Sequence, residues 1–364
     1  MCTALTYFDS ASRPYVGRTL ELNLLMPYEM VAVPAGTDLS STVPGKEAVK
    51  WTSAHSLVAI SAAKSGKPDS KDIEDYSLFD GANDAGLTTD FNAFSNDFEP
   101  PLPDVPSVLE AADLCLWILS QFSKVAEVRT ALESLPVNPT RLPVCGNVPY
   151  PMHGMITDSK GDSLVLEFEQ DSLKVIDNPV HVMTNNPAFD WHLTNLNNWT
   201  HLDNTDKSSS TFGSLDVAQP DSGIAIGALP SSNTAVDRFV RAAYYSKFAD
   251  KADDPDSALT ALSHVINNFD RPRGATVDPP GAAGEGVAFG GDDAPKGVSS
   301  EWTTHSFMSD PGQGRYLVRS SGAINWSQFD LGRLSGLDAP QMFPVESLDP
   351  MGGDATERFL SPAG

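Results

Sequence analysis

The chain has 364 residues, of which 40% are hydrophobic, enough for the core of one large domain or two small ones. Asp and Glu outnumber Lys and Arg by 48 to 24, and the formal net charge of -24 excludes nucleic acids and anionic membranes as expected partners. No run of about 18 apolar residues is present. Asp9, Arg13 and Arg18 interrupt any apolar segment near the start, so we expect no membrane span, no secretory signal and a cytoplasmic location.

The first hundred residues have the composition of β-strands separated by turns. Residues 2–8 are rich in Thr, Leu, Tyr and Phe, and the polar segment 9–14 that follows them is typical of a turn. The same reasoning predicts a turn at residues 80–86 and further strands at residues 15–22, 30–33, 57–61 and 87–94.

The pattern changes to helix after Pro106. Residues 108–122 are apolar nearly all round, which is typical of a helix buried between layers. Ser123 is expected to cap a second helix, whose apolar stripe is Val125, Val128 and Leu132. Strands are predicted again between residues 152 and 183.

A second helical region follows, and the chain then returns to strands. Helices are predicted around residues 236–243 and 258–269, and the Gly- and Pro-rich segment 271–300 is predicted to be a long loop. Strands are expected at residues 302–308, 315–320 and 324–331. This order of elements predicts α+β layers with largely antiparallel strands. We expect one domain over residues 1–339 and a loosely ordered tail over residues 340–364.

Three cysteines are present, and neither they nor the seven histidines show the spacing of a metal site, so no metal is expected. Cys115 lies in an apolar run and is expected to be buried and inert. Cys145 precedes Gly146 in a Pro-rich loop, and a papain-like pair that uses it has no local signature.

Cys2 differs from the other two because it directly follows Met1. A small residue at position 2 allows the initiator Met to be removed, which leaves one residue with both a thiol and a free α-amine. A free α-amine titrates near pH ~8, which suits a general base. The thiolate is the nucleophilic form of cysteine, so attacking group and base would lie on the same residue.

Four clusters of residues, the first of which contains Cys2, follow one another in a characteristic order. They occur together with the turn Asp80-Gly81-Ala82-Asn83-Asp84-Ala85-Gly86-Leu87. The clusters are Cys2-Thr3, Gly17-Arg18-Thr19-Leu20-Glu21, the segment 184–196 and the segment 237–243. Jointly they closely resemble the choloylglycine hydrolase family, which contains penicillin V acylases and bile salt hydrolases and belongs to the N-terminal nucleophile hydrolases.

The resemblance implies a fold, an activity and an assembly. It implies a four-layer αββα sandwich with two mostly antiparallel sheets and cleavage of linear carbon-nitrogen amide bonds. The substrate would be a small N-acyl amide, and no metal or organic cofactor would be needed. Homo-oligomers are usual in the family, so a dimer or tetramer is expected.

The resemblance also implies roles for individual residues. Cys2 would be the nucleophile after removal of Met1, and Arg18 matches an arginine beside the nucleophile, where a guanidinium favours thiolate over thiol. Glu21 falls where many members carry an aspartate, and it is one methylene longer. Arg238 matches a family arginine near the nucleophile, whereas Arg241 is expected to be solvated.

Two hydrogen-bond donors would stabilise the oxyanion that forms during attack. The resemblance assigns one of them to the side-chain N–H of Asn185. The other is a backbone N–H after the turn at residues 80–87. Counting without gaps from Gly86 places it at Ala93, and Asn92 is one residue away.

The sequence therefore predicts a cysteine amidase, most similar to penicillin V acylases, that works through a thioester on Cys2. The segment 24–29 is apolar and is expected to form part of the substrate pocket. Hydrolysis of conjugated bile salts or of N-acyl homoserine lactones is the alternative within the same chemistry. Two further functions fit the same residues: an acyltransferase, in which an amine intercepts the thioester, and a catalytically silent binding protein, with Glu21 marking a decayed site.

Overall fold

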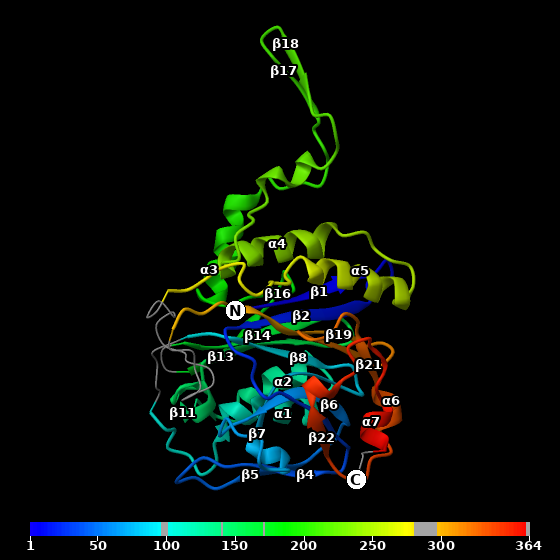
Figure 1. Ribbon diagram of the computed structural model, residues 1–364. Helices are drawn as coiled ribbons and strands as arrows, with labels where there is room; N and C mark the ends of the chain where they lie inside the picture. The colour runs from blue at the N-terminus through cyan, green and yellow to red at the C-terminus, as the bar shows by residue number, and fades with distance from the viewer. Residues whose placement is uncertain (96–100, 140, 170–171, 280–296, 362–364) are drawn as a thin grey trace.

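In the computed structural model, two large β-sheets pack face to face and helices cover the outer face of each sheet (Figure 1). The structure describes residues 1–95, 101–139, 141–169, 172–279 and 297–361. The four layers confirm the predicted αββα sandwich with mostly antiparallel sheets.

The first sheet holds seven strands and contains the start of the chain. Its strand order is β16-β1-β2-β19-β20-β21-β23, and only the pair β21 and β23 is parallel. The strands are β1 (Cys2–Phe8), β2 (Pro14–Leu22), β16 (Val182–Met183), β19 (Trp302–Asp310), β20 (Arg315–Ser320), β21 (Ser327–Asp330) and β23 (Gly353–Asp354).

The second sheet holds eight antiparallel strands in the order β15-β14-β13-β8-β7-β6-β3-β22. Its strands are β3 (Glu29–Val33), β6 (Leu57–Ala63), β7 (Tyr76–Asn83), β8 (Thr88–Ala93), β13 (Met152–Thr157), β14 (Ser163–Glu169), β15 (Ser172–Asp177) and β22 (Gln341–Pro344). Four separate two-stranded pairs are β4 (Asp38–Ser41) with β5 (Val49–Thr52), β9 (Leu109–Glu110) with β10 (Val137–Asn138), β11 (Arg141–Leu142) with β12 (Val148–Pro149), and β17 (Ser209–Phe212) with β18 (Leu215–Ala218).

Two pairs of helices form the outer layers. Helices α4 (Ala235–Phe248) and α5 (Pro255–Asn267) cover the first sheet, and α1 (Leu114–Gln121) and α2 (Val125–Leu132) lie beyond the second (Figure 1). The remaining α-helices are α3 (Phe189–Asn195), α6 (Leu331–Leu334) and α7 (Glu357–Leu360). In the part of the chain that the structure describes, no helix has the length and apolar character needed to cross a membrane. The cytoplasmic location stays a prediction.

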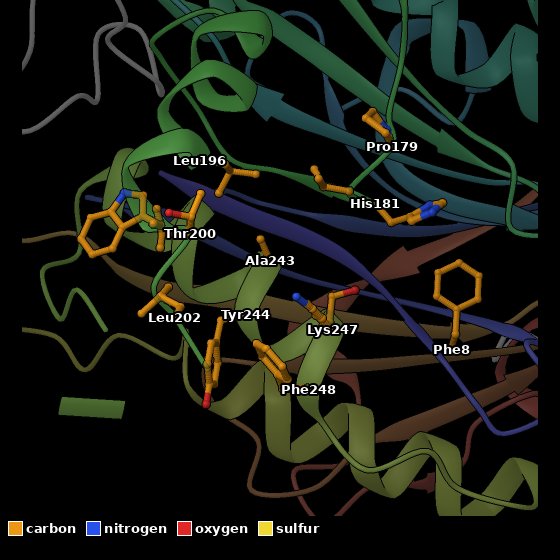
Figure 2. Close-up of a pocket in the computed structure, with 14 residues that line it drawn as sticks. Phe8, Pro179, His181, Leu196, Thr200, Leu202, Ala243, Tyr244, Lys247 and Phe248 are labelled. Carbon is orange, nitrogen blue, oxygen red and sulfur yellow. The ribbon is translucent and has the colours of Figure 1, made fainter. Parts of the chain in front are cut away.

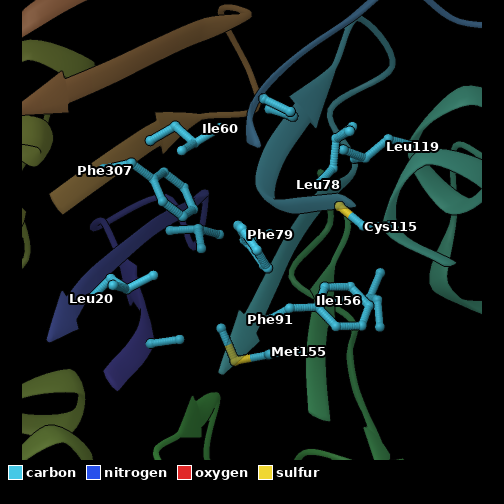
Figure 3. Close-up of a cluster of buried hydrophobic side chains, with 14 of the residues drawn as sticks. Leu20, Ile60, Leu78, Phe79, Phe91, Cys115, Leu119, Met155, Ile156 and Phe307 are labelled. Atoms are coloured by element: carbon cyan, nitrogen blue, oxygen red, sulfur yellow. The ribbon is translucent and has the colours of Figure 1, made fainter. Parts of the chain in front are cut away.

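The hydrophobic core fills the space between the two sheets (Figure 3). Leu20 of β2 and Phe307 of β19 face Phe79 of β7, and all three are buried. Burial of a side chain of this size stabilises the fold by about 1.5–3 kcal/mol. The core therefore holds β2 against β7, two of the strands that position the residues around Cys2.

Gly81 explains how α1 approaches the second sheet so closely. A Cβ at this position would lie 2.6 Å from Leu119 Cδ1 of α1 and 2.8 Å from the Val58 carbonyl oxygen. Because no side chain fits there, the turn motif at residues 80–87 places a glycine beside Asp80, whose side chain faces the opposite layer.

Residues 108–122 do not form one helix. Leu109 pairs with Val137 in the short strand β9, a 3-10 turn follows, and α1 begins only at Leu114. The apolar run is buried as predicted, but tertiary pairing of its first residues overrides the helical periodicity. The second helix begins after Lys124, where the Glu127 carboxylate accepts from two backbone N–H groups.

The C-terminal segment is ordered over most of its length, contrary to the expectation of a loose tail. Strand β22 pairs with β3, and Phe359 is fully buried against Phe329 and Phe343. These aromatic side chains pack at the edge of the core, and their burial stabilises the folded C-terminal segment. Of the predicted loop at 271–300, residues 280–296 lie outside the described residues.

Candidate active site

Cys2 is the first residue of β1 and is buried in the site, with 2% of its surface exposed. It pairs with Leu20 of β2. Arg18 of the same strand directs Nη2 toward Cys2 Sγ at 3.4 Å. The backbone nitrogen of Cys2 donates to Asn185 Oδ1 at 2.7 Å. Three of the predicted residues, distant in the sequence, therefore meet at one point.

Arg238 lies near the start of α4 and forms hydrogen bonds with both Cys2 and Asn185. Its Nη1 donates to the Cys2 carbonyl oxygen and to Thr3 Oγ1, the latter at 2.7 Å. Its Nη2 donates to Asn185 Oδ1 at 2.8 Å. Burial lowers the pKa of Arg238, and the nearby Glu21 carboxylate opposes that shift. The structure therefore places Arg238 directly beside Cys2.

A buried carboxylate, that of Asp80, pairs with Arg18 through the guanidinium nitrogen that does not face Cys2. Its Nη1 pairs with Asp80 of β7, and its Nη2 also donates to the Phe91 carbonyl oxygen at 2.7 Å. Burial lowers the pKa of Arg18, but Asp80, Cys2 and Asp90 together outweigh burial, and the pKa of Arg18 is raised. The guanidinium therefore stays charged and points at Cys2 Sγ.

Glu21 is buried at the end of β2, but its carboxylate contacts Thr303 and not Cys2. Thr303 Oγ1 donates to Glu21 Oε1 at 3.0 Å, and Oε2 has no partner among the described residues. Burial raises the pKa of Glu21, while Arg238 and the chain's terminal amine lower it. The Glu21 backbone pairs with Met1 in both directions, at 2.5 and 2.6 Å.

The hydrogen bonds of β8 show which way Ala93 and Asn92 face. The N–H of Phe94 bonds to the Pro151 carbonyl oxygen, toward β13. Because N–H groups alternate between the two edges of a strand, the N–H of Ala93 faces the other edge. On that edge the Ala93 carbonyl accepts from Asn185 Nδ2 at 2.6 Å, and pairing with β7 stops at Asp90. The backbone of Ala93 therefore faces the site, whereas the Asn92 side chain bonds to the Thr184 carbonyl oxygen.

A small apolar hollow opens beside Cys2 Sγ. Its lining includes Met26 and Tyr28, so the segment 24–29 contributes to the wall as predicted. Apart from Arg18 and the thiol group of Cys2, its lining residues are apolar or aromatic. The lining residues are Cys2, Arg18, Leu20, Leu22, Met26, Tyr28, Phe79, Ala93 and Met152.

A larger cavity of about 490 Å³ lies elsewhere, between α4 and the segment that follows α3 (Figure 2). Tyr244, Lys247 and Phe248 of α4 line one side of it, and Leu196 and Thr200 line the other. None of the predicted site residues borders this cavity. The candidate site is therefore the smaller hollow at Cys2.

The other cysteines lack the surroundings of a nucleophile. Burial raises the pKa of Cys115, whose Sγ lies 3.0 Å from Thr89 Oγ1. Burial raises the pKa of Cys145 to about 12. No group of three or more metal-ligating side chains occurs among the residues that the structure describes.

Sequence reasoning left several members of the site unassigned. Asp80 belongs to the turn motif at residues 80–87 but had no predicted role, and His305, 225 residues away, bonds to its carboxylate. His192 holds the backbone of Asn185 through Nε2 at 2.9 Å. Arg241, expected to be solvated, is buried and donates to the Pro230 carbonyl oxygen at 2.9 Å. Only contacts between distant strands and loops identify these residues.

The αββα sandwich with a cysteine at the head of its first strand defines an N-terminal nucleophile hydrolase fold. Solved structures share this fold. The C2A mutant of conjugated bile acid hydrolase from Clostridium perfringens superposes with a TM-score of 0.77 at 21% identity, covering 97% of this chain and 98% of that one. Penicillin V acylase from Agrobacterium tumefaciens gives 0.73 at 23% identity, covering 98% and 96%.

Residues 2–284 match the model of the linear amide C-N hydrolases, choloylglycine hydrolase family. The chain belongs to this family and is a hydrolase that acts on linear amides. It is 27% identical to the bile salt hydrolase/transferase of Clostridium perfringens, over 76% of this chain and 81% of that protein. It is 24% identical to the penicillin V acylase of Pectobacterium atrosepticum, over 99% and 86%.

Proposed function

We propose that this protein is a cysteine amidase in which Cys2 attacks the carbonyl of an N-acyl amide and becomes the acyl carrier. The convergence at Cys2 is the observation that supports it. Arg18 faces the sulfur, Asn185 holds the Cys2 nitrogen, and the Ala93 backbone closes the site. Glu21 and Arg238 flank these groups.

Asn185 and Ala93 supply the two oxyanion donors in this proposal. A side-chain amide nitrogen carries two hydrogens. One hydrogen of Asn185 Nδ2 goes to the Ala93 carbonyl oxygen, which leaves the second for the oxyanion. The Ala93 N–H is on the same edge of β8. Both donors are fixed before the substrate arrives, which makes them effective in stabilising the developing charge.

The Cys2 nitrogen supplies the acid and base steps once Met1 has been removed. Asn185 Oδ1 already holds this nitrogen at 2.7 Å, so the freed amine would be held at the same place beside the thiol. The amine takes the thiol proton and passes it to the leaving amine, and the C–N bond breaks as the thioester forms. It then takes a proton from water, whose oxygen attacks the thioester and releases the carboxylic acid and the thiol.

The substrate we propose has an apolar acyl group, as penicillin V has. The residues that line the hollow at Cys2 are almost all apolar, including Leu20, Met26 and Phe79. Conjugated bile salts and N-acyl homoserine lactones also join an apolar acyl group to an amine. Several relatives named as bile salt hydrolases make conjugated bile salts the second candidate.

Amine release from penicillin V, a glycine-conjugated bile salt and an N-acyl homoserine lactone tests the proposal. We expect wild type to turn over penicillin V fastest, Cys2→Ala to turn over none of the three, and Cys145→Ala to behave as wild type. A wild-type protein that binds these amides without cleaving them would instead be a binding protein. A product that carries an added amine in place of water would indicate a transferase.

We also propose that the protein forms a homo-oligomer through the hairpin of β17 and β18, which projects from the body (Figure 1). Phe212 and Leu215 at its tip are 70% and 62% exposed. Exposed apolar side chains gathered on one projection favour a protein interface. Sedimentation of wild type and of the double variant Phe212→Ser, Leu215→Ser tests this, because only loss of the interface lowers the mass of the variant.

A further inference from the structure

His305 is buried completely in β19 and stands behind the site without touching Cys2. Its Nε2 lies 3.0 Å from Asp80 Oδ2. The other oxygen of Asp80 pairs with Arg18 Nη1, and Arg18 Nη2 lies 3.4 Å from Cys2 Sγ. These contacts form a continuous buried chain from His305 to the sulfur.

The direction of the His305 hydrogen bond follows from its surroundings. Burial lowers the pKa of His305, against the opposing effect of its bond to Asp80. The ring is therefore neutral, and because a carboxylate only accepts, Nε2 carries the proton and donates to Asp80. Nδ1 is then the unprotonated nitrogen, and it has no partner among the described residues.

A β-bulge in β19 directs the His305 side chain toward Asp80. The register against β2 shifts between Thr303 and His305, so that Thr303 pairs with Glu21 and His305 with Leu20. Such bulges redirect side chains beside active sites. Here Thr303 reaches Glu21 on one side, and His305 reaches Asp80 on the other.

His305 also contacts the wall of the substrate hollow. Its ring meets the ring of Tyr28 edge-on, with the centroids 4.8 Å apart. Tyr28 lines the hollow beside Cys2. The His305 ring therefore contacts two groups of the site: the Asp80 carboxylate, which pairs with Arg18, and the Tyr28 ring, which lines the hollow.

We propose that His305 is a positioning residue for the Cys2 thiolate. By donating to Asp80 Oδ2, it draws part of the carboxylate's charge away from Arg18 and fixes the guanidinium so that Nη2 faces the sulfur. The proposal rests on the proposed function only in taking Cys2 as the nucleophile. The charged and titratable groups around this chain are Arg18 and Glu21 on β2, Tyr28 before β3, Asp80 on β7, Asp90 on β8, Cys115 on α1, Arg238 on α4 and Tyr316 on β20.

The pH profile of Cys2 alkylation by iodoacetamide, located by mass spectrometry, tests the proposal. The variants His305→Gln and His305→Asn differ only in reach, because the Gln amide nitrogen lies at the distance of Nε2 from Cβ and the Asn amide nitrogen does not. We expect the profile of H305N to move to higher pH by about 0.5–1 unit, which is part of the effect of one hydrogen bond to a charged group, because the bond acts on Cys2 only through Asp80 and Arg18. H305Q keeps the donor, so its profile should stay close to wild type.

A matched control is Tyr316→Phe, which removes a hydroxyl 3.4 Å from the Asp80 carbonyl oxygen but leaves the carboxylate untouched. Its profile should not move. Coincident profiles for H305N and wild type, or equal shifts in H305N and H305Q, would overturn the proposal. Should H305N fail to fold, His305→Met fills the space without a donor and takes its place. Penicillin V turnover by wild type, measured in parallel, separates failure of the proposed function from failure of this inference.

Discussion

Replacing Asn185 with Asp exchanges one NH2 group for an oxygen and leaves the shape of the side chain almost unchanged. Oδ1 still accepts from the Cys2 nitrogen at 2.7 Å and from Arg238 Nη2 at 2.8 Å. The donor to the Ala93 carbonyl oxygen is lost, and with it the hydrogen that we assign to the oxyanion. The substitution therefore removes the proposed catalytic donor, places a carboxylate oxygen beside the proposed oxyanion position, and retains the contacts that hold Cys2.

The expected loss is large and falls on kcat. Removal of one oxyanion donor costs ~10²–10³ in kcat, or about 2.7–4 kcal/mol of transition-state stabilisation. KM should change little, because the donor acts on charge that exists only in the transition state. Both constants come from the rate of amine release against the concentration of the amide that wild type cleaves, with urea unfolding to confirm the fold.

Asn186 provides the control for Asn185→Asp. Its Oδ1 accepts from the Ser95 nitrogen at 2.9 Å, and its Nδ2 donates to the Ser95 carbonyl oxygen at 2.8 Å, so Asn186→Asp loses the same kind of bond away from Cys2. This variant should keep the wild-type rate. An Asn185→Asp protein that is folded and as active as Asn186→Asp would refute the oxyanion role.

Arg238→Met should lower the free energy of unfolding by about 3 kcal/mol or more, because the Cys2 carbonyl oxygen, Thr3 Oγ1 and Asn185 Oδ1 each lose a charged donor; urea unfolding measures this. Asp90→Asn should stabilise the protein at pH 7. Burial raises the pKa of Asp90 well above 3.8, so the wild-type carboxyl contributes stability below pH 3.8 that is lost as pH rises; the advantage of the variant should vanish in unfolding curves near pH 4. Cys145→Ala should cost about 1 kcal/mol of stability and leave kcat unchanged.

The sequence and the family resemblance together predicted that Arg18, Asn185 and Arg238 lie close to Cys2. Arg18 is in the strand paired with Cys2, so short-range register already brings it close. Asn185 and Arg238 could be named only through the family resemblance, because no local pattern shows that a turn and a helix N-terminus meet at β1. The choice between Ala93 and Asn92 needed the hydrogen-bonding edges of β8, which pairing alone determines.

The contact between Asp80 and His305, next to Arg18, could not be predicted from the sequence. Asp80 and His305 come from different sheets and are 225 residues apart, so their contact is a product of layer packing and a bulge. Glu21 was placed correctly in the strand, but its side chain turns to Thr303 because of the same bulge. The helix prediction for residues 108–113 was wrong because a short apolar run has no periodicity that separates helix from buried strand.

The central claim is that Cys2, freed of Met1, is the acyl carrier. Intact mass spectrometry of the purified protein before and during incubation with penicillin V tests it most directly, with Cys2→Ala alongside. The account predicts a mass that lacks Met1, a transient acyl adduct on wild type and none on Cys2→Ala. An active protein that retains Met1 would have no free amine on Cys2, and the proposed mechanism would be wrong.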